Sequence, residues 1–292
     1  MKLAPGARVV VIGAGTMGHG IAHVAAASGY AVTLVDTTEE LVARGLEKIR
    51  ANLQGGIDRG KLTAEARDAT LARVATSTDV EVAARDAALV IEAIPERFEL
   101  KVELFETLEA AAQSDAILAS NTSSLSITDL QERLQRPQRM LGLHFFNPVH
   151  IMQLIEVVRG LETDEQVVRA GVDFCKALGR EPIVVNDAPG FASSRLGIAL
   201  GLEAMRMVEE GVASPADIDK AMELGYRHPM GPLRLTDVVG LDVRLDIARY
   251  LHEKLGGERF RPPAILERMV ADGRLGKKSG HGFYDWSGEK GA

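Results

Sequence analysis

Two residues twelve positions apart could carry acid–base chemistry. His144 ends the apolar run Met140–His144, and Glu156 lies inside the apolar stretch Leu154–Val158. A carboxylate embedded in an apolar strand is costly to bury unless it has a partner, and a nearby imidazole would be one. Histidine titrates near neutral pH, which suits the removal of a proton from an alcohol. The residues alone equally allow a loop histidine and an unrelated edge-strand glutamate.

A second set of residues could bind a dinucleotide. The turn Gly13-Ala14-Gly15-Thr16-Met17-Gly18 follows the apolar run Arg8–Ile12 and precedes a segment with helical character. In such a turn the first glycine permits the tight bend, the second lets the backbone approach a pyrophosphate, and the third lets helix pack on strand. The free N–H groups of the helix N-terminus suit phosphates.

The acidic residue Asp36 indicates which dinucleotide. It ends the next apolar run and lies 23 residues after Gly13, close to the spacing of about 20 that is typical of this turn. A carboxylate there can accept hydrogen bonds from both ribose hydroxyls and would repel a 2′-phosphate. The pattern therefore predicts NAD rather than NADP, and FAD remains the alternative because it uses the same turn.

The elements that must position these residues alternate between apolar runs and helical patterns. Buried strands separated by helices predict a Rossmann-type, doubly wound, mostly parallel sheet over residues 1–186. Sequence patterns of the capping-box type predict helix starts at Thr37, Thr78 and Thr163. The expected strands are Arg8–Ile12, Ala31–Val35, Arg73–Thr76, Ala88–Glu92, Ala116–Ala119, Met140–His144, Gln153–Val158 and Ile183–Val185.

Residues 187–292 read as an all-α domain. Leu196–Val208 is apolar on nearly every side, and such a helix needs burial on all sides, so we expect a homodimer formed through this domain. Ser214 followed by Pro215 predicts a further helix start. The domain is expected to close over substrate, with Asp187–Gly190 as the hinge.

Composition excludes several classes. The 292 residues carry 34 Lys and Arg against 41 Asp and Glu, a net charge of −7, which argues against nucleic acid as a partner. The single Cys175 excludes an internal disulfide, and without a Cys/His cluster no metal site is expected. Cys175 is expected to be a small buried residue. No apolar run is long enough to span a membrane, so a cytoplasmic protein is expected.

From end to end the chain resembles the L-3-hydroxyacyl-CoA dehydrogenase family, within it most closely the short bacterial 3-hydroxybutyryl-CoA dehydrogenases. Several segments carry this likeness in order. They are the Gly13–Gly18 turn with Asp36, Ile91–Glu96, Ala119–Leu125, His144–Pro148, Asp187–Phe191, His228–Pro232 and Gly276–Tyr284.

The resemblance implies an activity and residue roles. It implies the reversible oxidation of a short L-3-hydroxyacyl-CoA, such as 3-hydroxybutyryl-CoA, by hydride transfer to NAD. His144 matches the catalytic base, Glu156 the carboxylate that orients it, and Ser123 a residue that contacts both substrate and nicotinamide. The positions that match further NAD contacts are Glu96, Lys101, Asn147 and Lys278. Read without the family, Ser123 could equally cap a helix, and Lys101 and Lys278 could be solvated surface charges.

One position departs from the family pattern. Ser194 stands where the family usually carries an asparagine near the substrate carbonyl, and its hydroxyl lacks the paired donors of an amide. This departure leaves open an NAD-dependent dehydrogenase of a free 3-hydroxy acid, of the gulonate or carnitine type. A non-catalytic NAD-binding protein on the same scaffold is the alternative from another class.

The sequence gives the least information about which residues contact the CoA phosphates. A basic cluster after the second strand either borders the path of CoA or forms a solvated helix face. The adjacent Gly55-Gly56 suggests a mobile connection. The cluster comprises Arg44, Lys48, Arg50, Arg59 and Lys61.

Overall fold

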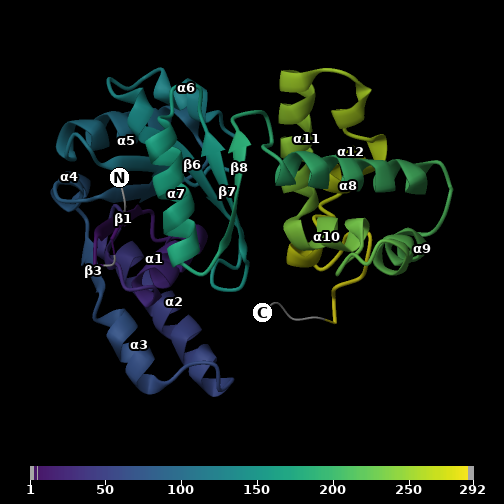
Figure 1. The fold of residues 1–292 in the computed structure, drawn as a ribbon. Helices are drawn as coiled ribbons and strands as arrows, with labels where there is room; N and C mark the ends of the chain where they lie inside the picture. Colours follow the sequence, from purple (N-terminus) through teal and green to yellow (C-terminus); the bar gives the residue numbers. More distant parts are fainter. Residues whose placement is uncertain (1–2, 5, 289–292) are drawn as a thin grey trace. The chain divides into compact units, whose positions relative to one another are not determined.

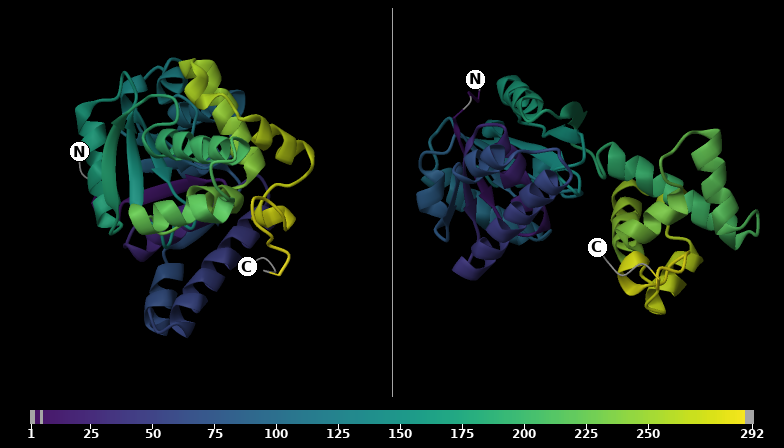
Figure 2. Two further views of the ribbon diagram at one scale, coloured as in Figure 1. Left: turned by 90° about the vertical axis from the view of Figure 1, so that its right-hand side faces the viewer. Right: turned by 90° about the horizontal axis from the view of Figure 1, so that it is seen from below.

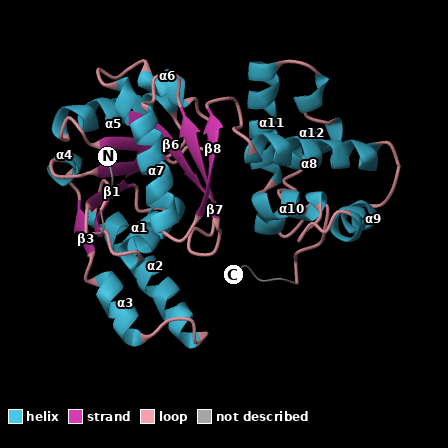
Figure 3. Cartoon of the chain, viewed as in Figure 1, coloured by secondary structure: helices cyan, strands magenta, loops and turns pink. Residues whose placement is uncertain are grey.

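The chain forms two compact units, Met1–Ala188 and Pro189–Ala292, in a computed structural model that describes residues 3, 4 and 6–288. Within these residues, every strand of the sheet lies in the first unit, and the second is built from helices (Figure 3). No helix among them is long and apolar enough to cross a membrane.

The first unit is built on an eight-stranded sheet in the order β3-β2-β1-β4-β5-β6-β7-β8. All neighbouring strands pair in parallel except β6 and β7, which are antiparallel. The predicted doubly wound, mostly parallel sheet is confirmed. Its strands are β1 (Arg8–Ile12), β2 (Ala31–Val35), β3 (Val74–Ser77), β4 (Leu89–Glu92), β5 (Ile117–Ser120), β6 (Met140–Phe145), β7 (Leu154–Arg159) and β8 (Glu181–Asn186).

The strand order reverses at β1, which has β2 on one side and β4 on the other. Ligands of open α/β sheets bind outside the carboxyl ends of the strands at such a reversal. The glycine turn follows β1 directly, so the fold places it at this crevice. The expected bounds of β1 and β2 agree with the structure, and the other strands are longer, shorter or shifted by one or a few residues.

Helices flank the sheet, and one pair extends away from it. Figures 1 and 2 show α2 and α3 as neighbouring helices that project beyond the strands. Gly55 and Gly56 lie inside α2, so the expected mobile connection at these residues is wrong. The helices are α1 (Thr16–Ala27), α2 (Glu39–Asp58), α3 (Ala64–Leu71), α4 (Val80–Ala84), α5 (Phe98–Ala111), α6 (Ile127–Gln131), α7 (Glu165–Ala177) and the 3₁₀ turn η1 (Pro137–Arg139).

Three predicted helix starts are displaced by one residue. The N-cap side chain must reach the N–H group three positions on, and Thr38, not Thr37, accepts from the Leu41 N–H at 3.3 Å. The Thr37 hydroxyl lies against Asp36 instead. The three N-cap residues are Thr38, Asp79 and Asp164, one after each threonine that the pattern indicated.

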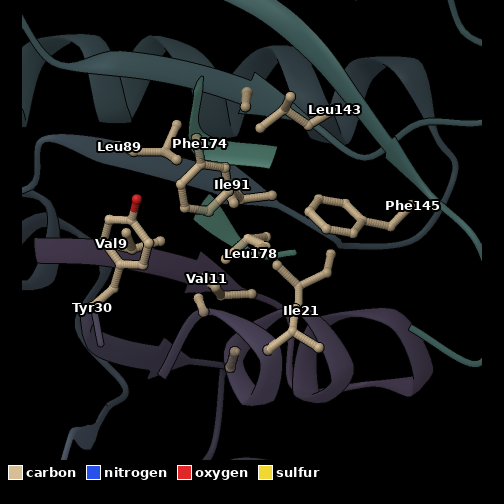
Figure 4. Close-up of a cluster of buried hydrophobic side chains, with 14 of the residues drawn as sticks. Val9, Val11, Ile21, Tyr30, Leu89, Ile91, Leu143, Phe145, Phe174 and Leu178 are labelled. Carbon is tan, nitrogen blue, oxygen red and sulfur yellow. The ribbon is translucent and has the colours of Figure 1, made fainter. Parts of the chain in front are cut away.

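The core of the first unit lies between the sheet and its helices. Figure 4 shows aliphatic side chains of β1, β4 and β6 packed against Ile21 of α1, with Phe174 of α7 and Leu178 close by. Tyr30 meets Phe174 edge to face with ring centroids 5.1 Å apart. Cys175 is fully buried as expected, and burial raises the pKa of its thiol to about 12.

The second unit encloses its own apolar core, formed largely by α8, α10, α11 and α12. Ser214 caps α9 as predicted, accepting from the Asp217 N–H at 3.2 Å. The elements are α8 (Ser193–Glu209), α9 (Pro215–Lys220), the π-helical turn η2 (Ala221–Gly225), α10 (Pro232–Val239), α11 (Leu241–Leu255), η3 (Glu258–Phe260), α12 (Ala264–Ala271) and η4 (Lys277–Ser279).

Helix α8 packs on the core of its unit with one face, and the chain itself does not bury the helix on all sides. Ile198, Leu202 and Met205 are buried in the core, whereas the Leu196 side chain is 72% exposed. One face packs on its own unit, and Leu196 lies outside it.

Candidate active site

The glycine turn has one position that is open to a ligand. Gly13 has φ +96°, and a Cβ on it would lie 2.5 Å from the carbonyl oxygen of Ala93. A Cβ on Gly18 would lie 1.6 Å from the carbonyl oxygen of Gly13. A Cβ on Gly15 would meet no described atom within 4 Å. Gly13 and Gly18 are thus required by packing, whereas Gly15 leaves open space where a pyrophosphate would approach.

The carboxylate of Asp36 lies beside this turn. One carboxylate oxygen accepts from the Ala14 N–H at 2.7 Å, and the other accepts from the Thr37 N–H at 2.7 Å. Helix α1 begins after Gly15, has no side-chain cap and carries no acidic residue in its first turn. Free N–H groups and the positive end of a helix dipole suit a phosphate, and a carboxylate beside them suits ribose hydroxyls.

Asp36 supports a test of cofactor choice. Asp36→Asn keeps the side-chain shape but loses the charge, so we expect the ratio of kcat/KM for NADH to kcat/KM for NADPH to fall by roughly tenfold to a hundredfold, the value of a hydrogen bond to a charged group. Steady-state kinetics with both cofactors measures this ratio. An unchanged ratio would show that Asp36 only braces the turn.

His144 and Glu156 meet across the one antiparallel strand pair of the sheet. They are direct partners in the register of β6 and β7, and opposite residues of such a pair project to the same face. The His144 Nδ1 lies 2.7 Å from the Glu156 Oε2. Glu156 is fully buried and His144 is 6% exposed. The alternative of two unrelated residues is therefore wrong, and the buried carboxylate has its imidazole partner.

Asn121 is a site residue that the sequence reasoning missed. It follows β5, and its Oδ1 accepts from the Phe145 N–H at 2.9 Å, one residue after His144. The bond ties the carboxyl end of β5 to that of β6 and fixes the backbone that carries the histidine. The available signal was its place directly after an apolar strand, the same place that singled out His144.

Ser123 lies on a loop organised by Glu96. The Glu96 carboxylate accepts from the Thr122 hydroxyl at 2.5 Å and from the Ser123 N–H at 3.1 Å. The Ser123 hydroxyl lies 3.5 Å from the same oxygen. Helix α6 is capped by Ser126, so the hydroxyl of Ser123 does not serve as the cap.

Lys101 is not a surface charge. Its side chain is 1% exposed, and its Nζ lies 2.5 Å from Glu92 and 3.2 Å from Glu96. Glu92 is fully buried at the end of β4 and accepts from the Ser120 hydroxyl at 2.6 Å and from the Ile94 N–H at 2.8 Å. Sequence reasoning missed Glu92, although a carboxylate within an apolar run was the signal that singled out Glu156.

The charge balance of this group sets the ionisation of Glu96. Burial opposes its charge and is the largest single influence, but the Lys101 ammonium together with the Thr122 and Ser123 hydrogen bonds outweighs it and lowers the pKa of the carboxyl. Glu96 is therefore ionised at neutral pH, and its carboxylate accepts the hydrogen bonds of the loop that carries Ser123.

The buried pair predicts a strong coupling. Lys101→Met leaves the buried Glu92 carboxylate without its cation, so we expect a loss of about 3–5 kcal/mol in the free energy of unfolding. Adding Glu92→Gln to Lys101→Met is expected to recover part of that loss, because no buried charge is then left unpaired. Urea unfolding of the single and double variants measures both values, and additive losses would contradict the coupling.

Two predicted site residues belong to the second unit. The Nζ of Lys278, in η4, lies 2.5 Å from the Asp242 carboxylate. Ser194 lies in the first turn of α8 and is partly exposed. Asn147, exposed, lies on the first unit directly after Phe146.

The basic cluster proves to be mixed. Arg44 and Arg50 pair with Glu40 and Glu47 on their own exposed helix face, as a solvated face would. Arg59 and Lys61 instead line a cavity of the first unit.

The fold and the site together define the class of enzyme. A doubly wound sheet with a glycine turn and a carboxylate after β2 binds NAD, and a histidine–carboxylate pair at the end of a strand suits proton removal from an alcohol. The arrangement is that of an NAD-dependent dehydrogenase.

Comparison with known proteins gives the family. Residues 8–188 match the 3-hydroxyacyl-CoA dehydrogenase NAD-binding domain, and residues 190–286 match the 3-hydroxyacyl-CoA dehydrogenase C-terminal domain. The chain belongs to the 3-hydroxyacyl-CoA dehydrogenase family.

Relatives resemble the chain over nearly its whole length. A probable 3-hydroxybutyryl-CoA dehydrogenase of Bacillus subtilis is 43% identical over 279 residues, covering 96% of this chain and 97% of that protein. The 3-hydroxybutyryl-CoA dehydrogenase of Bradyrhizobium diazoefficiens is 42% identical, covering 97% and 96%. The crystal structure of (S)-3-hydroxybutyryl-CoA dehydrogenase from Ralstonia eutropha has a TM-score of 0.93 at 39% identity, covering 96% and 98%.

Proposed function

We propose that this protein interconverts a short L-3-hydroxyacyl-CoA, such as 3-hydroxybutyryl-CoA, and the corresponding 3-ketoacyl-CoA with NAD, using His144 as the base. The observation that carries the proposal is the buried contact of 2.7 Å between the His144 Nδ1 and Glu156. The printed names of the relatives support the substrate.

The geometry suits the removal of a hydroxyl proton. With Nδ1 held by the Glu156 carboxylate, the proton on that nitrogen is fixed and Nε2 is the basic atom. Nε2 takes the proton of the C3 hydroxyl while the C3–H bond breaks and the C3–O bond gains double-bond character. NAD⁺, when held at the glycine turn, would supply the acceptor for the hydride that leaves C3. Glu156 then stabilises the imidazolium, and the reverse reaction returns the proton to the carbonyl oxygen.

Other residues position the reactants in this proposal. Ser123, held by Glu96, contacts substrate and nicotinamide, and Asn147 contacts the cofactor. Lys101 acts through Glu96, since its ammonium is buried between carboxylates. Lys278 is assigned to the cofactor, and Ser194 to the thioester carbonyl, to which it can supply one hydroxyl donor. The pyrophosphate is held by the turn residues Gly13, Gly15, Thr16, Met17 and Gly18, and the ribose by Asp36.

We also propose a homodimer formed through the second unit. Large apolar side chains are exposed there, at least 39% each for Leu196, Leu235, Val238, Val239 and Val243. An apolar surface of this kind is typical of an interface. Light scattering at micromolar concentration is expected to give twice the mass of the chain, and a monomer would contradict the proposal.

The activity is tested by NADH-dependent reduction of acetoacetyl-CoA, compared with reduction of free acetoacetate and oxidation of free 3-hydroxy acids of the gulonate and carnitine type. We expect kcat/KM for the thioester to exceed that for the free acids by at least about a hundredfold, the effect of leaving the site's polar groups unpaired. Higher values for a free acid would favour the second substrate class, and tight NADH binding without turnover of either would favour a non-catalytic protein.

A further inference from the structure

A buried arginine of the second unit has no anionic partner. Arg244 lies near the start of α11 and is 7% exposed. Its Nε is buried without a hydrogen-bond partner among the described residues. Burial is the only influence that shifts the pKa of Arg244, which it lowers to about 10, so the guanidinium is charged at neutral pH. A buried charge is costly unless it is paired, and an anion is therefore expected beside it.

The carboxylates nearest to Arg244 in the chain do not supply this anion. Asp242 and Asp246 are each two positions away on α11, and residues two apart on a helix do not face each other. Asp237 is fully buried, but its carboxylate accepts from the Trp286 indole N–H at 2.9 Å. The anion that the guanidinium requires must come from outside this part of the chain.

The guanidinium lies against a face of α8 that is formed by small residues. A Cβ on Gly197 would lie 3.5 Å from the Arg244 Nη1, and Gly197 is partly exposed. A Cβ on Gly201, on the same face, would lie 3.3 Å from the Thr236 Oγ1, a second buried polar atom that has no partner within the described ranges. Ser194 lies about one turn before Gly197 and shares this face. Two unpartnered polar groups thus border the face of α8 that begins at Ser194.

We propose that Arg244 binds a carboxylate at the far end of the acyl chain, so that this protein accepts 3-hydroxyacyl-CoA thioesters of dicarboxylic acids. The inference rests on the proposed function, in which Ser194 is assigned to the thioester carbonyl. Ser194 and Gly197 are separated by about one helical turn, roughly 5 Å, which four or five carbon–carbon bonds of about 1.5 Å can span. A six-carbon chain that ends in a carboxylate, as in 3-hydroxyadipyl-CoA, has this length.

The chemistry of the substrate makes the acyl end the source of the anion. On the other side of the thioester the pantetheine arm is uncharged, and the phosphates of CoA lie beyond it. A carboxylate pairs with a guanidinium through two parallel hydrogen bonds, the geometry for which arginine is suited. Ser194 favours the same assignment, because its side chain is shorter than the asparagine that the family usually carries and leaves room on this face for a longer acyl chain.

The kinetic test compares two substrates of equal chain length. 3-Hydroxyadipyl-CoA ends in a carboxylate, and 3-hydroxyhexanoyl-CoA ends in a methyl group. We expect kcat/KM for oxidation by NAD⁺ to be about tenfold to a hundredfold higher for the first, the value of a hydrogen bond to a charged group. Arg244→Met should remove this preference, and Arg244→Lys, which keeps the charge but loses the planar fork, should retain only part of it. Arg249→Met, at an exposed position of α11, is the matched control and should keep the preference.

Binding of unreactive thioesters separates recognition from turnover. Adipyl-CoA and hexanoyl-CoA lack the hydroxyl group at C3, and calorimetric titration gives their Kd values. We expect adipyl-CoA to bind the parent protein at least about tenfold more tightly, or about 1.4 kcal/mol, and both thioesters to bind Arg244→Met equally. Equal Kd values in the parent would overturn the inference even if 3-hydroxyhexanoyl-CoA is oxidised. A preference for adipyl-CoA without oxidation of either 3-hydroxyacyl-CoA would instead reject the proposed function alone.

A carboxylate from a second copy of the chain is the competing source of the anion. In that case Arg244→Met would lower the mass measured by light scattering and would reduce kcat/KM for both substrates alike, and either result would contradict the proposal. On our assignment the mass stays that of the parent. The midpoint of urea unfolding should be equal to or higher than that of the parent, because the variant removes a buried charge that has no partner before the substrate binds.

Discussion

Replacing His144 with alanine is expected to lower kcat for acetoacetyl-CoA reduction by about 10²–10⁴-fold, the usual contribution of a general acid–base group. The reason is specific to this site: its imidazole is held by a carboxylate directly across the strand pair, at 2.7 Å. His144 lies one residue before the end of β6, and urea unfolding of the variant checks that the fold survives. Steady-state kinetics measures kcat, and fluorescence titration of NADH should show a Kd within about twofold of the parent.

Glu156→Gln distinguishes orientation of the base from mere packing. The amide fits the space of the carboxylate but cannot stabilise an imidazolium. We therefore expect the single variant Glu156→Gln to lose much of the parent kcat, with little change in KM. The His144→Ala/Glu156→Gln double variant should be no worse than His144→Ala alone, because the carboxylate acts only through the imidazole. Losses that multiply would show that Glu156 has a separate role, and full activity of His144→Ala would reject the mechanism.

The second large effect is expected at the glycine turn. Two similar substitutions there should have different consequences, one for stability and one for NADH binding alone. Gly18→Ala places a Cβ 1.6 Å from the Gly13 carbonyl oxygen, so α1 or the turn must move. We expect a loss of about 1–3 kcal/mol or more in the free energy of unfolding, as overpacking typically gives, together with loss of NADH binding.

Gly15→Ala should leave the fold intact. Its Cβ meets no described atom within 4 Å, so the free energy of unfolding should change by no more than about 1 kcal/mol, the N-cap difference between glycine and alanine. The methyl group fills the space of the pyrophosphate, and we expect the Kd of NADH to rise by roughly ten- to a hundredfold, or about 1.4–2.8 kcal/mol.

Urea unfolding and NADH titration of both variants separate the two effects. Gly225→Ala is the matched control, because its Cβ also meets nothing within 4 Å and it belongs to the second unit. Unchanged NADH affinity in Gly15→Ala would contradict the placement of the pyrophosphate at this turn.

The sequence by itself determined the class of fold and the candidates for chemistry. Apolar runs separated by helical patterns are local signals, and they predicted the strands of the sheet closely, β1 and β2 without error. The glycine turn and Asp36 indicate a dinucleotide site because of their spacing along the chain. His144 and Glu156 could be singled out because each is polar at an otherwise apolar strand, where burial demands a reason.

Only the tertiary structure decided which residues meet. The pairing of His144 with Glu156 depends on the register of two antiparallel strands, and a slip of one residue would place them on opposite faces. Asn121 reaches Phe145 from the loop after β5, and Lys101 reaches Glu92 from helix α5. The cavity that Arg59 and Lys61 line combines side chains from segments far apart in the chain, including His23 and Arg180. Periodicity reports which face of an element is buried, whereas contacts between elements depend on how the elements pack, so these partners became visible only in the folded chain.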